Sequence, residues 1–383
     1  MAAPVFRPVR TGGFVHPGIV NSAASLETMQ LRAAAGVPAT LAAVEKLRAS
    51  RYARLSWSAR PVASVACGSG ANVGCAAETD DAQAAYTHAL LWTLIGDPRH
   101  AARAIEILNG WSAVLTEHRF DTRQHENGLL QAAWGAQTFT KAAELIRYSG
   151  AGWAADDIAR FASMLRTAFL PRVRDGWKAG ASNWQLSMAE ATINIGVFLD
   201  DQAVFADGIG DWREQTRAHI VSDSDGIRPL VPANTTVTEA YLATYWKNPR
   251  RWVPGLSQET CRDLSHAAMF FAAALAGAET ARIQGMDLFD EESERLRTGM
   301  EFHARTLNAM AQGQTPADWP GRDAPKLGGT AWALTWAVGL NHYQGRLGYP
   351  MPHSEALLER IRPTGTGLHM NWETLTHGPN RPA

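Results

Sequence analysis

An arginine and a histidine stand four residues apart just before the longest apolar stretch of the chain. Arg262 and His266 precede the run from Ala267 to Ala278, which is rich in alanine and carries no charge. Residues at i and i+4 of a helix share one face, so we expect both side chains at the start of a buried helix. A guanidinium can bind an acidic substrate while a neighbouring imidazole moves a proton. The alternative is structural: Arg262 pairs with a carboxylate, and His266 completes a buried polar cluster.

A second group of polar side chains follows Ser182. Asn183 is a suitable helix N-cap, and its amide could instead donate a hydrogen bond to a ligand. Trp184 beside it could stack on a sugar ring. The chain has 14 tryptophans, most of which must fill the core, so their number alone is a weak indication of carbohydrate binding.

A third group surrounds residue 130. Asn127, Gln131 and Trp134 follow the polar loop that contains His125, and their spacing places them on one helix face. This face could line a sugar subsite. Alternatively, Asn127 caps the helix and Trp134 packs in the core.

A fourth group ends an apolar helix near residue 346. His342, Tyr343 and Arg346 could contact a substrate. Equally, the histidine and the arginine could simply favour the negative end of the helix dipole.

Motifs for metal or nucleotide chemistry are missing from the sequence. There is no HExxH, no GxSxG, no Walker loop and no dinucleotide fingerprint. Asp223 and Asp225 resemble the start of a calcium loop, but Asn234 and Thr235 stand where a glutamate ligand is required. We therefore expect no cofactor and no metal.

The composition argues against several classes of protein. A formal net charge of −1 over 383 residues provides no positive surface for nucleic acid. The sequence has no apolar run of about 18 residues, so we expect no membrane span. We expect no signal peptide at Met1, where the basic-then-apolar pattern is missing, and we interpret the first residues as a mature end with an added initiator methionine.

Cys67 and Cys75 flank a glycine-rich polar loop that could close a small disulfide. Zinc is not expected there, because no third or fourth ligand lies nearby. A disulfide would favour a secreted or periplasmic protein in its mature form. Two free thiols would fit a cytosolic protein, and the sequence leaves both possibilities open.

Helical periodicity dominates the chain, and period-2 alternation is nearly absent, which predicts an all-α protein without a substantial sheet. The expected helices span residues 25–35, 38–50, 79–96, 98–117, 128–148, 154–170, 184–198, 201–221, 257–285, 290–311, 328–344 and 353–361. Short turns between successive helices predict stacked helical hairpins.

The long irregular segments are 51–78, 118–127, 171–183, 222–256 and 312–327. In a helical toroid, such loops would surround the mouth of a central cleft. The composition does not shift along the chain, so we expect a single domain over residues 1–383, with a loose arm at 1–15 and a loose tail at 372–383.

Several motifs, taken in order, resemble the alginate lyase superfamily. The resemblance runs from His16 to about Pro363. Its motifs are Asn183-Trp184, the segment from Gln258 to His266, Glu279-Thr280-Ala281 with Gln284 to Leu288, and Asn341-His342-Tyr343 with Arg346-Leu347-Gly348. The resemblance implies an incomplete (α/α) toroid of about six helical hairpins with a substrate cleft. It also implies metal-free β-elimination on a uronic-acid polysaccharide.

This sequence departs from the best-known alginate lyase pattern at two positions. That pattern has an asparagine–histidine pair where this chain has Asn183 and Trp184. It has a catalytic tyrosine seven residues after the arginine, where this chain has Met269. Both proton-handling groups of the pattern are therefore replaced.

Our first hypothesis is a monomeric polysaccharide lyase in which Arg262 and Asn183 neutralise the substrate carboxylate. His266 would be the base or a proton shuttle, and the acid would be Tyr343 or a tyrosine of segment 222–256. The expected substrate-binding residues are Trp184, Asn127, Gln131, Trp134, His125, His342, Arg346 and Tyr245.

Two alternatives remain from the sequence. A glycoside hydrolase would need two carboxylates facing each other across the cleft, drawn from Glu126, Glu190, Glu239, Glu259 and Asp263. A non-catalytic protein that binds acidic glycans would explain the two replaced residues. The sequence selects neither the uronate polymer nor endo over exo action.

Overall fold

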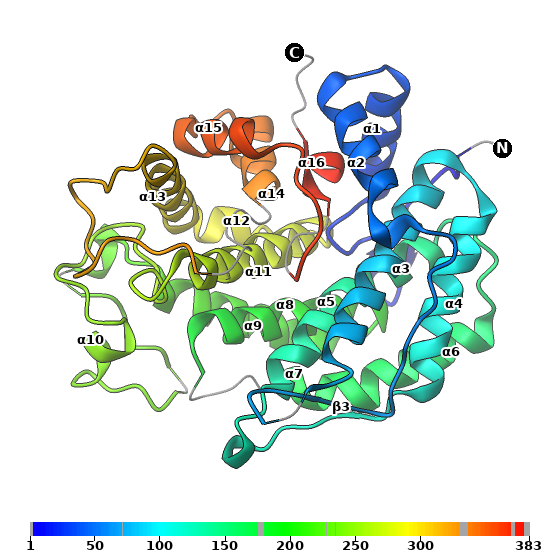
Figure 1. The fold of residues 1–383 in the computed structure, drawn as a ribbon, viewed down its shortest axis with the longest axis horizontal. Helices are drawn as coiled ribbons and strands as arrows, with labels where there is room; N and C mark the ends of the chain where they lie inside the picture. Colours follow the sequence, from blue (N-terminus) through cyan, green and yellow to red (C-terminus); the bar gives the residue numbers. More distant parts are fainter. Residues whose placement is uncertain are drawn as a thin grey trace.

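The computed structural model describes residues 3–70, 72–174, 180–226, 228–233, 235–328, 336–368 and 372–378. Helices dominate these residues, which confirms the predicted all-α class (Figure 1). The helices are α1 (Ala23–Ala34), α2 (Pro38–Ala49), α3 (Cys75–Ile95), α4 (Pro98–Val114), α5 (Gly128–Arg147), α6 (Ala155–Met164), α7 (Leu170–Val173), α8 (Ser182–Phe198), α9 (Gln202–His219), α10 (Leu242–Tyr245), α11 (Leu264–Ile283), α12 (Leu288–Glu291), α13 (Ser293–Ala311), α14 (Trp336–Leu340), α15 (Pro352–Ile361) and α16 (Glu373–Thr376).

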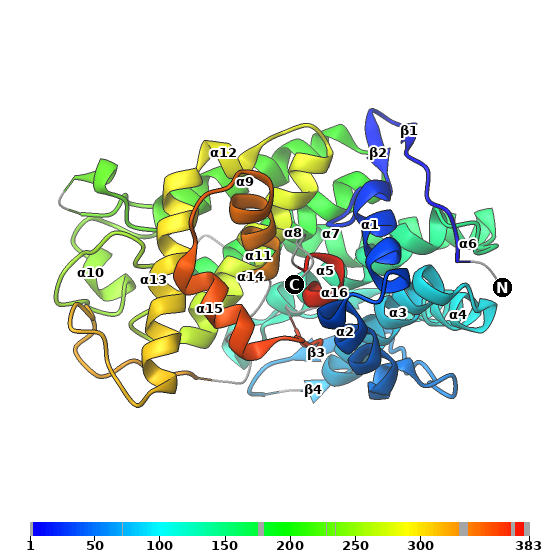
Figure 2. The same cartoon turned by 90° about the horizontal axis from the view of Figure 1, so that it is seen from above.

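Four helices, α3, α5, α8 and α11, form a buried inner row in which each packs against the next. Buried residues occur on all sides of these helices, as expected for helices that contact neighbours all round. The helices α4 and α9 pack on the inner helices α3 and α8 that precede them, which gives helical hairpins. In Figure 2, α13 and α15 lie on one side of this row and α4 and α6 on the other.

The inner helices are parallel, because residues near the start of one contact residues near the start of the next. Contacts between later residues follow the same order. The pairs are Glu78–Gln131 and Trp92–Ser149 for α3 and α5, Gln137–Ser187 and Arg147–Phe198 for α5 and α8, and Asn183–Met269 and Asn194–Thr280 for α8 and α11. One end of the row therefore gathers the four N-termini, and the other end gathers the four C-termini.

The N-terminal segment closes the end that holds the C-termini. His16 Nδ1 lies 2.6 Å from Glu144 Oε1, and its Nε2 lies 3.1 Å from Asp200 Oδ1. The side chain of Gln284 hydrogen-bonds to the backbone of Val15 and Gly18. We call this end, bounded by these residues, the closed end.

Strands are few and short in the described residues. The antiparallel hairpin of β1 (Val9–Thr11) and β2 (Phe14–His16) precedes α1. Strand β3 (Ser64–Cys67) pairs antiparallel with β4 (Asn72–Val73) and parallel with β5 (Glu117–His118). A disulfide joins Cys67 to Cys75, with Cα atoms 5.7 Å apart, and ties β3 to the start of α3.

Two expectations about the chain ends are wrong for the described residues. The arm at 1–15 is not loose from residue 3 onward, because Phe6 and Phe14 are buried and the hairpin is formed. The tail at 372–383 is packed from 372 to 378: Trp372 is buried and its indole N–H donates to Thr87 Oγ1 at 2.9 Å. Both segments are mostly polar with isolated apolar residues, so the sequence suggested that they were loose. One buried aromatic side chain is enough to hold several neighbouring residues in place.

The expected helix at 328–344 lies partly outside the described residues, at 329–335. Its remainder forms α14 and a π-helical turn, η5 (Asn341–Arg346). A second π-helical turn, η3 (Leu165–Phe169), joins α6 to α7, and short 3-10 turns stand at η1 (Arg51–Ala53), η2 (Thr122–Gln124) and η4 (Asp223–Asp225).

Candidate active site

Three of the inner helices each have one residue near their start that is not buried. Every residue of α5 is buried except Trp134 and Arg147, and every residue of α8 is buried except Trp184. In α11, His266 is the first residue that is not buried, and the next is Arg282. Because the three helices are parallel neighbours, Trp134, Trp184 and His266 mark the same end of the row. We call this the open end.

Asp263 orients His266 at the open end. The carboxylate of Asp263 caps α11 by accepting the His266 backbone N–H at 2.9 Å. His266 Nδ1 lies 2.8 and 2.7 Å from the two carboxylate oxygens, so Nδ1 carries the proton that it donates. The side chain remains 27% exposed. This arrangement leaves Nε2 as the basic nitrogen.

The pKa of Asp263 is lowered from its ordinary value. Burial alone would raise it, but the hydrogen bonds from His266 and the charges of His266 and Arg262 outweigh that effect. Asp263 is therefore ionised at neutral pH and can stabilise a protonated His266.

Arg262 lies outside the helix, which corrects the predicted start at residue 257. The helix begins at Leu264, so Arg262 and His266 do not share a helical face as expected. They are brought together through Asp263 instead: Arg262 Nε is 3.8 Å from Asp263 Oδ2, and Nη1 is 3.3 Å from Glu259 Oε2. The Arg262 side chain is still 46% exposed and can reach an anionic ligand.

Asn183 meets Met269 between α8 and α11. The amide Nδ2 of Asn183 lies 3.1 Å from Met269 Sδ, a weak acceptor. Asn183 is fully buried, and its Oδ1 has no hydrogen-bond partner among the described residues. Buried amide oxygens are nearly always hydrogen-bonded in proteins, and a functional site is one explanation for an exception.

Gln258 fixes the start of α8. Its Oε1 accepts the Ser182 backbone N–H at 3.1 Å, and its Nε2 donates to the Tyr245 carbonyl at 2.5 Å. This buried glutamine therefore joins α8 to α10 and to the segment that precedes α11.

Tyr245 and His219 form a buried pair beside the same helix start. Tyr245 Oη lies 2.9 Å from His219 Nε2 and 3.2 Å from the Gly180 carbonyl, and His219 Nδ1 donates to the Gln215 carbonyl. Burial lowers the pKa of His219 to about 4. Burial also raises the pKa of Tyr245, with a smaller contribution from Glu259. At neutral pH the histidine is therefore neutral and the tyrosine keeps its proton.

The sequence analysis missed His219 and Gln258 as parts of this region. His219 ends an ordinary amphipathic helix, and its only signal is its place next to the long irregular segment 222–256. Gln258 stood inside the segment that we interpreted as helix. Its structural role depends on a hydrogen bond from the backbone of Ser182, 76 residues away, and no local sequence pattern predicts such a contact.

The predicted roles of Tyr343, His342 and Arg346 are wrong, because all three belong to the closed end. Tyr343 is fully buried and donates its hydroxyl to the Phe289 carbonyl at 3.0 Å. His342 stacks on Phe289, with ring centroids 4.1 Å apart. Arg346 pairs with Glu279, near the end of α11. With a rise of about 1.5 Å per residue, Glu279 is about 20 Å along α11 from His266.

The residues around α5 are only partly available to a ligand. Gln131 Nε2 donates to Glu78 Oε2 at 2.7 Å, and Glu78 Oε1 lies 2.7 Å from His118 Nε2. The Asn127 backbone N–H donates to the Cys67 carbonyl, and its side chain makes no capping hydrogen bond. His125 is exposed in a left-handed conformation, with φ of 53°.

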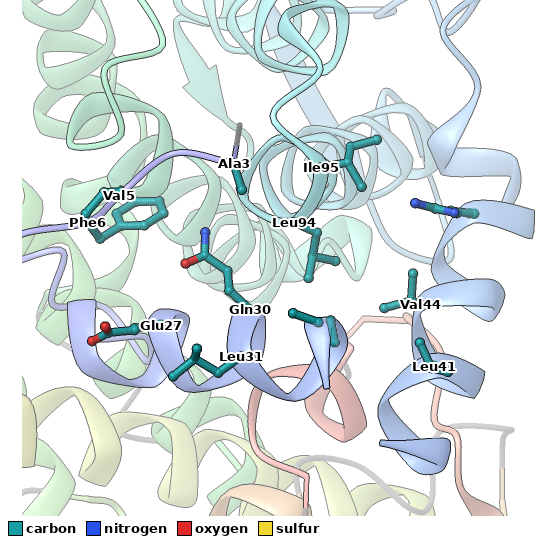
Figure 3. Close-up of a pocket in the computed structure, with 13 residues that line it drawn as sticks. Ala3, Val5, Phe6, Glu27, Gln30, Leu31, Leu41, Val44, Leu94 and Ile95 are labelled. Atoms are coloured by element: carbon teal, nitrogen blue, oxygen red, sulfur yellow. The ribbon is translucent and has the colours of Figure 1, made fainter. Parts of the chain in front are cut away.

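The apolar groove of about 580 Å³ in Figure 3 is a separate feature. It lies between α1, α2, the end of α3 and residues 3–6, and Leu31, Val44 and Leu94 line it. It contains no histidine, so it offers no acid–base pair of the kind at the open end.

Solved structures were found that resemble this one over nearly its whole length. An alginate lyase from Bacteroides ovatus has a TM-score of 0.57 and 12% identity, and the match covers 95% of this chain and 99% of that chain. Alginate lyase A1-III from Sphingomonas species A1 has a TM-score of 0.60 and 14% identity, with 92% and 94% covered. A variant of A1-III in complex with a tetrasaccharide has a TM-score of 0.63 and 15% identity, with 97% and 96% covered. The fold is that of the alginate lyases.

The chain is thus an incomplete (α/α) toroid, as the sequence resemblance implied. No family model matches the chain, and no curated protein sequence matches it either. At 12–15% identity the likeness describes the fold and leaves the chemistry to the residues themselves.

The described residues indicate neither a metal site nor a membrane span. No three histidine, cysteine, aspartate or glutamate side chains lie close enough there to hold a metal ion. Within the same residues, no helix is long and apolar enough to cross a membrane.

Proposed function

We propose that this protein is a polysaccharide lyase that cleaves a uronic-acid glycan by β-elimination at the open end. The observation that carries the proposal is the arrangement of Asp263, His266 and Arg262. An ionised carboxylate orients a partly exposed histidine, and a half-exposed guanidinium lies next to both. The fold adds support, since a solved alginate lyase of this fold is in complex with a tetrasaccharide.

The reaction begins with removal of the C5 proton, which is acidified by the neighbouring carboxylate group of the sugar. Arg262 would neutralise that carboxylate and stabilise the enolate-like intermediate. His266 Nε2 would accept the proton, and Asp263 would stabilise the resulting imidazolium. Asn183 would donate a hydrogen bond from its amide to the substrate carboxylate after the substrate displaces the weak contact with Met269.

The leaving oxygen at C4 needs a proton, and Tyr245 is the best candidate to give it. Its hydroxyl carries a proton at neutral pH, as an acid requires. Tyr245 also lies beside the start of α8, through its contact with the Gly180 carbonyl. Trp184 and Met269 cannot exchange protons, so neither can perform this step.

Binding of the polymer would use the exposed faces of Trp134 and Trp184, since aromatic rings stack on sugar rings. Asn127, His125 and the neighbouring Gln131 would extend the surface along α5. The disulfide between Cys67 and Cys75 lies under this region and supports a secreted or periplasmic location, where disulfides persist.

A second candidate function is non-catalytic binding of acidic glycans. Trp184 and Met269 favour it, because both stand where the resembling pattern has proton-handling residues. The glycoside hydrolase alternative gains no such support: Glu190 lies 3.3 Å from Lys141, Glu126 pairs with Arg119, and Glu259 lies near two cations.

The proposal is tested by incubating the protein with a panel of uronic-acid polysaccharides. The absorbance of the conjugated C4–C5 double bond is followed in the ultraviolet. A rise with one polymer establishes β-elimination and names the substrate class. Binding of a polymer without any rise would overturn the lyase and support the binding protein, and release of reducing ends without a rise would indicate a hydrolase.

A further inference from the structure

A second polar pocket lies at the closed end, remote from His266. It has a volume of about 300 Å³ and is bounded by the first turns of α1, the end of α11, the π-helical turn η5 and the residues after α16. Helices α1 and α16 lie side by side in both views (Figures 1 and 2). The pocket therefore joins parts of the chain that are more than 300 residues apart.

Arginines dominate the charge of this pocket. Arg282 and Arg346 each make two hydrogen bonds of 2.8–2.9 Å to the buried carboxylate of Glu279. Arg32 also lines the pocket and donates to the carbonyls of Leu375 and Gly378. The described residues that line the pocket include no carboxylate, and Glu279 lies behind the two guanidiniums.

The positive charge exceeds the negative charge even when nearby groups are counted. Glu279 supplies one negative charge to Arg282 and Arg346, and Asp287 acts on Arg282 from beside the pocket. With Arg32, three cations face these two carboxylates. Arg282 and Arg346 are 29% and 28% exposed, so part of each guanidinium remains open to a ligand.

The N-terminus of α1 forms part of the same wall, although the Ser25 and Thr28 hydroxyls donate to carbonyls of the helix itself. Ser22 and Ser25 form a capping box there, and both line the pocket. Backbone N–H groups and the helix dipole at this end favour an anion. Thr28 lies one turn further and completes the hydroxyl-bearing side.

A buried histidine provides an independent indication of a ligand. His377 is 2% exposed and lines the pocket, and its Nδ1 lies 2.8 Å from Thr376 Oγ1. Its Nε2 has no hydrogen bond of ordinary geometry among the described residues: the ring has only a weaker interaction with the Val20 backbone, and Glu279 Oε1 is 3.9 Å away. A buried ring nitrogen left in this state calls for an explanation, and an occupant of the pocket would supply its partner.

We propose that this pocket binds a small oxyanion, in the form of a phosphate or a carboxylate group. Planar guanidiniums recognise either group through paired hydrogen bonds. A volume of about 300 Å³ admits inorganic phosphate or one sugar acid. The bound anion would hold α1, α11 and the C-terminal segment together and so stabilise the fold by mass action. The proposal is independent of the lyase activity, because its residues lie at the other end of α11.

The experiment measures binding of inorganic phosphate, sulfate and glucuronate to the whole protein by isothermal titration calorimetry. Thr28→Glu places a negative charge at the exposed rim of the pocket without touching the Glu279 pairs. Leu31→Glu is the matched control, since it adds the same charge to α1 at a residue that lines the apolar groove instead. Arg262→Gln controls for glucuronate binding at the open end.

We expect at least one of the three anions to bind with a dissociation constant in the millimolar range or below. Thr28→Glu should weaken that binding roughly tenfold, and Leu31→Glu should leave it nearly unchanged. Preference for phosphate over glucuronate identifies a phosphate ligand, and the reverse identifies a sugar acid. The proposal is overturned if none of the anions binds, or if binding is insensitive to Thr28→Glu.

Discussion

His266 at the open end and His16 at the closed end both contact carboxylates, yet they are suited to different tasks. His16 is fully buried, and both of its ring nitrogens are bonded, to Glu144 and to Asp200. Burial alone would lower the pKa of His16, but the two carboxylates raise it. His266 uses one nitrogen on Asp263, and its side chain is 27% exposed.

The same contrast holds for the arginines of the two ends. Arg346 is fixed by two hydrogen bonds of 2.8 Å to Glu279, whereas Arg262 has contacts of 3.3 and 3.8 Å to its carboxylates. The closed end uses charged groups to hold helices together. The open end leaves a nitrogen and part of a guanidinium available, which is what acid–base chemistry requires.

The largest expected effect comes from Asp263→Asn. Asparagine caps a helix as well as aspartate does, so the fold should survive. The loss of the carboxylate disturbs the protonation and orientation of His266, and kcat should fall by about 10²- to 10⁴-fold. Asp201→Asn, at the N-cap of α9, is the matched control and should retain full activity.

Glu279→Gln should be the most damaging change at the closed end. It leaves Arg282 and Arg346 without their shared counter-charge, which costs about 3–5 kcal/mol of the free energy of unfolding. Urea denaturation monitored by circular dichroism measures this loss. A change below about 1 kcal/mol would contradict the role given to this carboxylate.

Glu279 also makes the stability depend on pH. Burial would raise its pKa, but the hydrogen bonds and charges of Arg282 and Arg346 lower it from 4.5 to about 2. Because the folded-state pKa is lower, the stabilisation is present above the unfolded value and is lost as pH falls from about 4.5 toward 2. Glu279→Gln should therefore reduce the acid sensitivity of the free energy of unfolding.

A pair of tyrosines gives the next largest effect. Tyr245→Phe removes the proposed acid, and kcat should fall by about 10²-fold or more. Tyr343→Phe removes only a hydrogen bond to the Phe289 carbonyl and should cost about 1 kcal/mol of stability with activity intact. Equal activity of the two variants would exclude Tyr245 as the acid.

A smaller effect than that of Glu279→Gln is expected for the disulfide near the open end. Replacing Cys67 and Cys75 by serine opens a loop with a sequence separation of 8 and should cost about 2.5 kcal/mol of unfolding free energy. Thermal unfolding measures the change. The free thiol Cys261 supplies the control, since Cys261→Ser should shift the unfolding temperature far less.

Periodicity was sufficient to predict the helical class, because α4, α9 and α13 each have an apolar face. It was insufficient at the start of α11. Asp263 is the N-cap, so the helix begins only after it. The residues before Asp263 form hydrogen-bonded turns, and their sequence resembles that of a helix.

Residue type and spacing were enough to single out His266, Arg262, Asn183 and Trp184, which the structure brings to the open end. Tyr343 could not be assigned in this way, since its place at the closed end depends on the parallel packing of helices far apart in sequence. His219 was missed for the same reason, because its partner Tyr245 lies 26 residues away across an irregular segment.

The central claim is that His266 removes a proton during β-elimination. The most direct test follows the ultraviolet absorbance of the unsaturated product for His266→Ala and for His353→Ala, an exposed histidine at the start of α15. We predict that kcat falls by about 10²- to 10⁴-fold for His266→Ala and is unchanged for His353→Ala, with both variants folded. Near-normal turnover of His266→Ala on the substrate of the wild-type protein would contradict the account.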